Sequence, residues 1–297
     1  MKVSSKDMAA APWRVTSEAY APVSGVFPGA RGSVSSAMRM RFHCVFATCL
    51  TLLPAWASAQ DSGGELPATF TSDRPGFANT TGIAAQGRLS TELGVSAAFG
   101  DTPEASLPLL SMRFGVFHWL EARVRGPNAV GRFPDTGDRY GVDDPSIGFK
   151  IGGQLHDTLA VSSVWEVSLP LGTDGFGSRE AGWFADLNID WSFWGPLTLT
   201  PNAVAHVRVT VDETTGETVR YFEGGGSLKF TWQLLDVLGA FVQGYAIASE
   251  RADIAIQVGG GLMWMVAPNV QVDAQFNAGV TDASEPPTAG MGTTILW

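Results

Sequence analysis

The stretch GRLSTELGVSAAFG, residues 87–100, alternates apolar and polar side chains. The apolar or nearly apolar set is Leu89, Thr91, Leu93, Val95, Ala97 and Phe99. The positions between them are polar or small: Ser90, Glu92, Gly94 and Ser96. Because successive side chains of a β-strand point to opposite faces, this stretch predicts a strand with one apolar face.

The same alternation continues to the end of the chain in about twelve segments. Most of these segments exceed the ~5–6 residues of soluble strands and approach the ~9–11 residues of a tilted membrane strand. No apolar run after residue 60 reaches the ~18 residues of a spanning helix. The segments are 87–100, 106–116, 120–130, 144–154, 159–170, 183–194, 197–210, 220–233, 237–249, 254–267, 270–281 and 288–297.

The connections between these segments alternate between two kinds. FHW, LHDT, GP, LLD and APN are short, whereas FGDTPEAS, GRFPDTGDRYGVDD, LGTDGFGSREAG, VDETTGETV, ASERAD and TDASEPPT are longer and mostly acidic. Outer-membrane barrels have tight periplasmic turns and longer outward loops. The sequence therefore predicts an all-β fold, a transmembrane antiparallel up-and-down β-barrel of about twelve strands over residues 87–297.

Mid-strand charges all fall on the face opposite the apolar one. A charge on the lipid face near the bilayer midplane costs ~2–4 kcal/mol, so these side chains are expected to line the lumen. A soluble sandwich is the alternative, with the apolar face buried and the charges in water. The predicted lumenal residues are Glu92, Arg113, Glu121, Arg123, Arg125, Lys150, Glu166, Asp186, Asp190, Arg208, Glu223, Lys229 and Asp273.

Aromatic residues gather at the predicted strand ends, as in the interfacial girdles of membrane barrels. Phe117 and Trp119 flank one short turn, and Trp191 and Trp194 precede another. The last strand ends on Trp297, and this ending resembles the sorting signal that the barrel-assembly machinery reads. We expect that machinery, outer-membrane lipid and lipopolysaccharide as partners of a monomeric chain.

A secretory signal is predicted ahead of the barrel. Arg39 and Arg41 precede a short apolar run, which ends at Ala57-Ser58-Ala59. This pattern predicts a signal peptide over residues 38–59 and export to the bacterial outer membrane, whereas a spanning anchor would need ~20 apolar residues. Residues 1–37 are interpreted as a non-native N-terminal extension. Both cysteines, Cys44 and Cys49, lie in the signal, so no disulfide or thiol site is expected.

Residues 60–86 lie between this signal and the first strand. They contain TSDRPGFANTT, in which Pro75-Gly76 and Asn79-Thr80-Thr81 favour turns. We predict a short periplasmic plug: Arg74 pairs with a lumenal carboxylate such as Glu92 or Glu121, and Asp73 fixes the turn through backbone N–H groups. A flexible leader is the alternative.

The stretch FTSDRPGFANTTGIAAQGRLSTELGVS, residues 70–96, resembles the N-terminal signature of the outer-membrane family described as the putative MetA pathway of phenol degradation. GVDDPSIGFKIGGQL, with Lys150, and APNVQVDAQFNAGVTD, with Asp273, are similar to two later strands of that family. Ser72 stands where the family more often has Thr. The resemblance covers residues 68–297 and implies a monomeric barrel that transports aromatic or other hydrophobic compounds.

The residues favour some functions over others. Passive transport of small solutes, hydrophobic or aromatic, is the leading hypothesis, and a closed structural or surface-interaction barrel is the alternative. An outer-membrane lipid hydrolase is disfavoured, because His206 has lumenal parity and no serine lies nearby on its strand. The acidic loop with Asp135, Asp138, Asp143 and Asp144 lacks EF-hand spacing, so neither a metal nor a cofactor is expected. The net charge of −10 disfavours nucleic acid.

Overall fold

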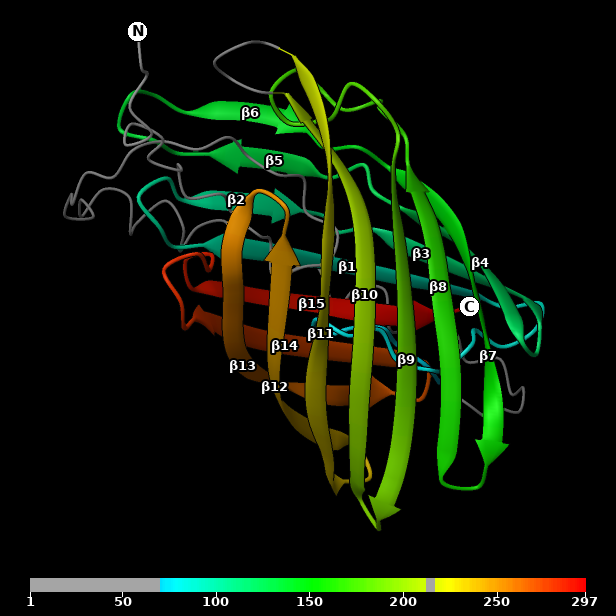
Figure 1. Cartoon of the computed structure of the whole chain (residues 1–297). Helices are drawn as coiled ribbons and strands as arrows, with labels where there is room; N and C mark the ends of the chain where they lie inside the picture. Colours follow the sequence, from blue (N-terminus) through cyan, green and yellow to red (C-terminus); the bar gives the residue numbers. More distant parts are fainter. Residues whose placement is uncertain (1–69, 212–216) are drawn as a thin grey trace, which may run out of the picture.

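The computed structural model describes residues 70–211 and 217–297 (Figure 1). Twelve antiparallel strands form a closed barrel, because β15 pairs with β1 from Ser90↔Leu296 to Ala98↔Thr288. The prediction of an all-β transmembrane barrel of about twelve strands is confirmed. The barrel strands are β1 (Leu89–Ala98), β3 (Ser111–Phe117), β4 (Leu120–Arg125), β7 (Ser146–His156), β8 (Leu159–Ser168), β9 (Gly182–Trp194), β10 (Leu197–Val211), β11 (Thr218–Leu235), β12 (Leu238–Ser249), β13 (Ala252–Ala267), β14 (Val270–Gly279) and β15 (Thr288–Leu296).

Three short strands extend one sector of the barrel. They are β2 (Glu104–Leu107), β5 (Ala129–Arg132) and β6 (Arg139–Val142), and they continue the lines of β3, β4 and β7 beyond a break. β2 pairs with both β1 and β5, and β5 pairs with β6, so the three lie side by side (Figure 1). Each break contains a proline, Pro108, Pro127 or Pro145, which has no N–H to donate to a neighbouring strand.

These breaks correct two of the expected segments. Residues 106–116 and 120–130 were each predicted as one strand, and each is divided in two. Residues 139–142, predicted as loop, form β6.

The two ends of the barrel differ in their connections. Five two-residue turns lie at one end, here called the short-turn end, at 118–119, 157–158, 195–196, 236–237 and 268–269. The longer connections 99–103, 133–138, 169–181 and 280–287 lie at the other, the long-loop end. One expected long loop, ASERAD, is a tight turn at Glu250-Arg251, because β12 and β13 extend into it.

The barrel wall has an apolar outer face and a polar inner face. On β7, Ile147 and Phe149 are about half exposed, whereas the neighbouring Lys150 is fully buried. An apolar solvent around the barrel makes this distribution favourable, because in water the outer apolar side chains would remain exposed to water. No helix among the described residues is long and apolar enough to cross a membrane.

The predictions for residues 1–37, for the signal peptide at 38–59, for Cys44 and Cys49, and for residues 60–69 fall outside the described residues.

Candidate functional site

Residues 70–88, here called the N-terminal segment, run through the inside of the barrel. Their backbone reaches the wall where Gln86 bridges to Gly115 of β3, just before β1 begins. The segment has short polar side chains and turn-forming residues, and Gly76 adopts a positive φ of 123° that favours glycine. The chain can therefore fold back on itself within the lumen instead of pairing as a strand.

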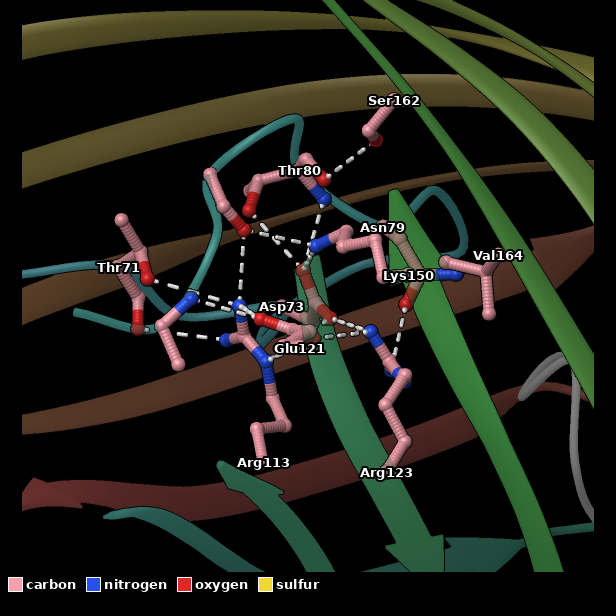
Figure 2. A network of polar contacts seen from close by, with 12 residues as sticks. Thr71, Asp73, Asn79, Thr80, Arg113, Glu121, Arg123, Lys150, Ser162 and Val164 are labelled. Carbon is pink, nitrogen blue, oxygen red and sulfur yellow. Dashed lines mark hydrogen bonds and ion pairs between the residues drawn. The ribbon is translucent and has the colours of Figure 1, made fainter. Parts of the chain in front are cut away.

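Asp73 is the centre of the contacts between this segment and the wall (Figure 2). Its Oδ2 lies 2.6 Å from Arg123 Nη1 and its Oδ1 lies 2.8 Å from Lys150 Nζ. Arg113 Nε is 3.5 Å from the same carboxylate. Thr80 donates to Oδ1 from both its backbone N–H and its hydroxyl, each at 3.0 Å, so Asp73 also closes the turn between residues 73 and 80.

Two wall carboxylates separate the cations around Asp73. Glu121 Oε1 lies 2.9 Å from Arg113 and 3.0 Å from Arg123, and Glu92 Oε1 lies 3.0 Å from Arg113. Glu92 also accepts the backbone N–H of Asp73 at 2.9 Å. All of these side chains are at most 4% exposed, so each charge needs its partners.

The charges of this cluster balance only when the segment is present. The wall contributes four cations and three carboxylates: Arg113, Arg123, Arg125 and Lys150 with Glu92, Glu121 and Glu166. Asp73 supplies the fourth negative charge. Burial raises the pKa of Asp73, but the charges of Arg113, Lys150 and Arg123 outweigh burial and hold the pKa well below its usual value. Asp73 is therefore ionised at neutral pH.

Arg74 docks over the seam where the first and last strands meet. Its Nη2 lies 3.3 Å from Asp273 Oδ1 on β14. A Cβ at Gly94 or at Gly292, which face each other across the β1–β15 pair, would come within 2.8 Å of the guanidinium. These two glycines form a notch, and any larger side chain there would displace Arg74.

The opposite wall binds the segment through hydrogen bonds and one aromatic stack. Asn79 donates to Asp186, and Thr81 donates to Asp190 Oδ2 from its N–H at 2.9 Å and its hydroxyl at 2.7 Å. Phe77 stacks on Tyr245 with ring centroids 4.2 Å apart. The segment thus contacts the wall on opposite sides of the lumen.

The structure brings most of the predicted lumenal charges to these contacts. Arg125 pairs with Glu166 at 3.0 Å, and Arg208 pairs with Glu223 at 2.8 Å nearer the long-loop end. The Lys229 ammonium donates to the carbonyl of Ala78. In the acidic loop, Asp143 binds Asn128 and Asp144 binds Gly172 and Ser178, so these carboxylates stabilise loops.

A cavity of about 410 Å³ lies between the N-terminal segment and the long-loop end. Asp73 to Phe77 form its floor, and the 172–179 loop and the end of β10 contribute to its wall. Phe77, Phe176 and Phe184 line it together with Arg125 and Arg208, so it offers both aromatic surface and charge. Pro75, predicted in the segment, also lines this floor.

His206 on β10 belongs to this cavity, although it was not among the predicted site residues. It is 5% exposed, and its ring lies 4.6 Å from that of Phe184. Its lumenal parity was visible in the sequence. Its place beside the cavity was not, because that depends on pairing with β9 and β11.

The closed barrel, its apolar outer face and its charged, occupied interior define an outer-membrane β-barrel protein. The chain belongs to the family described as "Putative MetA-pathway of phenol degradation", whose model matches residues 72–297. The resemblance seen in the sequence is confirmed.

Comparison with solved structures gives distant similarities. The NanC porin is 11% identical with a TM-score of 0.49, over 70% of this chain and 98% of that one. The CymD monoaromatic hydrocarbon channel is 11% identical with a TM-score of 0.38, over 71% of this chain and 88% of that one. The NalP translocator domain from Neisseria meningitidis is 11% identical with a TM-score of 0.46, over 86% and 97%. No curated protein matches the chain significantly. The closed strand pairing, and not these distant similarities, therefore identifies the fold as a twelve-stranded barrel.

Proposed function

We propose that this protein is a passive outer-membrane channel for small solutes, hydrophobic or aromatic, and that residues 60–86 include a plug that closes its lumen. The carrying observation is the cavity of about 410 Å³ whose floor is the N-terminal segment itself. A single aromatic ring fits this volume, and its aromatic lining suits such a solute. Membership of a family named for phenol degradation supports the same class.

The polar floor supports a regulated route. Asp73, Asn79 and Thr81 are held by side chains of the wall, so the path between cavity and periplasm opens when these contacts break. The long-loop end faces outward in this proposal and the short-turn end faces the periplasm, as in outer-membrane barrels generally. A solute entering from outside then reaches the cavity first and the plug second.

A closed structural barrel is the alternative. The contacts of the N-terminal segment with the barrel wall favour this alternative if the segment stays in the lumen permanently. We disfavour an enzyme, because among the described residues Nε2 of His206 has no hydrogen-bond partner and Nδ1 lies beside Glu223, so no serine hydroxyl is paired with this imidazole. We retain the signal peptide at 38–59, a non-native extension at 1–37, lipopolysaccharide contact and recognition of Trp297 by the assembly machinery as parts of the proposal, together with a monomeric state.

Liposome flux tests the channel directly. The full mature chain is reconstituted, and swelling is measured in solutions of phenol, of a sugar of similar size and of a large dextran. Uptake of phenol and its increase when residues 70–81 are deleted are the expected results. A deletion variant that folds with the heat-modifiable mobility of a barrel and still passes none of the small solutes would contradict the channel.

A further inference from the structure

The carboxylate of Asp73 occupies a position that the barrel wall surrounds with cations (Figure 2). Its Oδ1 lies 2.8 Å from the Lys150 ammonium, and its Oδ2 lies 2.6 Å from Arg123 Nη1. Arg113 Nε lies 3.5 Å from the same Oδ2. These cations come from β7, β4 and β3, which are neighbours in the sheet. Three wall strands therefore direct their donors at one carboxylate.

The Lys150 ammonium depends on the N-terminal segment for its hydrogen bonds. Its acceptors are Asp73 Oδ1 at 2.8 Å and the carbonyl of Gly82 at 2.9 Å, and both belong to that segment. The Lys150 side chain is 0% exposed. A buried ammonium without an acceptor is costly, so undocking of the segment favours the arrival of another anion at this position.

The two guanidinium groups have partners that the segment does not supply. Arg123 contacts Glu121 at 3.0 Å and Glu166 at 2.9 Å. Arg113 contacts Glu121 at 2.9 Å and Glu92 at 3.0 Å. All three carboxylates belong to the wall, and they fix the directions of the guanidinium donors. The cationic position is therefore largely preorganised, which lowers the cost of binding an anion there.

Undocking of the segment also withdraws Arg74 from Asp273. Asp273 lies on β14, and β15 and β1 separate that strand from β3. The negative charge uncovered at Asp273 therefore does not replace Asp73 beside Lys150.

The geometry around Asp73 favours a carboxylate over a single-centre anion such as chloride. One oxygen contacts an ammonium and the other contacts a guanidinium, and both are charge-assisted hydrogen bonds, the stronger class. The cavity of about 410 Å³ leads to this position, because Asp73 is among its lining residues. A solute in the cavity thus lies next to the group that it would replace.

We propose, building on the release of the plug in the channel function above, that Lys150, Arg123 and Arg113 form a binding site for the carboxylate of a small organic acid. In the closed barrel Asp73 occupies this site as a built-in competitor. A solute carboxylate that takes its place binds the undocked state and not the docked one, so it shifts the equilibrium toward the undocked state. The acid thereby favours the opening of its own route.

The test compares benzoate with benzamide, which has nearly the same shape and no charge. Binding is measured at neutral pH by ligand-observed NMR on the full mature chain in nanodiscs, with empty nanodiscs subtracting partition into lipid. Asp73→Asn removes the competing carboxylate, and Lys150→Met in that background removes the ammonium. Arg220→Met in the same background is the control, because it removes a cation from an exposed ion pair with Glu180.

We expect Asp73→Asn to bind benzoate at least about tenfold more tightly than the unaltered chain, since a hydrogen bond to a charged group contributes about a factor of ten or more. The gain for benzamide should be less than about twofold. Lys150→Met should reverse the benzoate gain, Lys150→Arg should retain part of it, and Arg220→Met should leave it unchanged.

Three results would overturn the site. They are the absence of a benzoate gain in folded Asp73→Asn, equal gains for benzoate and benzamide, and a benzoate gain that survives Lys150→Met. Displacement of benzoate by chloride at the same concentration would overturn the assignment to a carboxylate.

Liposome flux separates this inference from the channel function. Benzoate binding that depends on Lys150, without any flux through Asp73→Asn, leaves the site standing and removes the channel. Equal flux of benzoate and benzamide that does not depend on Lys150 leaves the channel standing and removes the site.

Discussion

Replacing Asp73 by Asn should release the N-terminal segment from the wall. The amide has nearly the shape of the carboxylate and can still accept from Thr80, but it carries no charge. Arg113, Arg123 and Lys150 would then keep only Glu92, Glu121 and Glu166 as buried counter-charges, with Arg125 also sharing Glu166. One positive charge of the cluster is left uncompensated inside the barrel.

The size of the effect follows from the burial of these groups. Removing one partner of a buried ion pair typically costs ~3–5 kcal/mol. All three contacts of Asp73 are to side chains that are 0% exposed, so solvent screens them little. If the docked and released states are in equilibrium, the ratio of released to docked protein should rise roughly 10²- to 10⁴-fold, since ~1.4 kcal/mol corresponds to a factor of ten.

Planar-bilayer recording measures this population as the fraction of time the channel conducts. Asp135→Asn is the matched control, because it removes the same charge from an exposed loop position. Asp73→Asn combined with Lys150→Met restores neutrality and should recover part of the closed state. A folded Asp73→Asn protein that stays as silent as the unaltered chain, with unchanged hydrogen exchange in residues 72–81, would refute the electrostatic docking of the segment.

Three further results are expected. The pKa of Asp73 is lower in the docked state than its unfolded-state value of ~3.9. The ionised carboxylate therefore stabilises the docked state above pH ~3.9, and this stabilisation is lost as the pH falls through the lowered pKa. The difference in conductance between the unaltered chain and Asp73→Asn should be constant from pH 5 to 8 and shrink in stronger acid. Phe77→Ala removes a side chain that is 5% exposed and stacked on Tyr245, which should weaken docking by ~3–5 kcal/mol and speed exchange of the residue 77 amide. Val258→Arg places a charge on the outer face of β13, where Val258 is 49% exposed, and should lower the unfolding free energy in lipid by ~2–4 kcal/mol, measured by urea titration against an exposed-loop substitution.

The alternating pattern predicted the wall well because each position has only two possible environments. Glu121, Arg123 and Lys150 were placed inside by parity alone, and the structure buries all three. The breaks at Pro108 and Pro127 lie inside segments that the alternation predicts as single strands, because the alternation continues across them. At Pro145 the difference is the reverse, since β6, which precedes that break, lies in a stretch predicted as loop.

The partners inside the lumen could not be predicted from parity. Which carboxylate meets Arg74 depends on the stagger between strands, and Asp273 on β14 is far from Arg74 in sequence. The neighbouring residues in the sequence predict that Asp73 forms a turn. They do not predict its three cationic partners, because these lie on three separate strands. The cavity depends on where the segment stops, and no local pattern encodes that.

The glycine notch makes the docking of Arg74 depend on closure of the barrel. Gly94 belongs to the first strand and Gly292 to the last, so the seat for the Arg74 guanidinium does not exist until these two strands have joined. Arg74, although it precedes the barrel in the chain, can therefore take this seat only after the first and last strands have paired. A barrel left open at this seam would have no such notch, so a docked Arg74 reports that the first and last strands are paired.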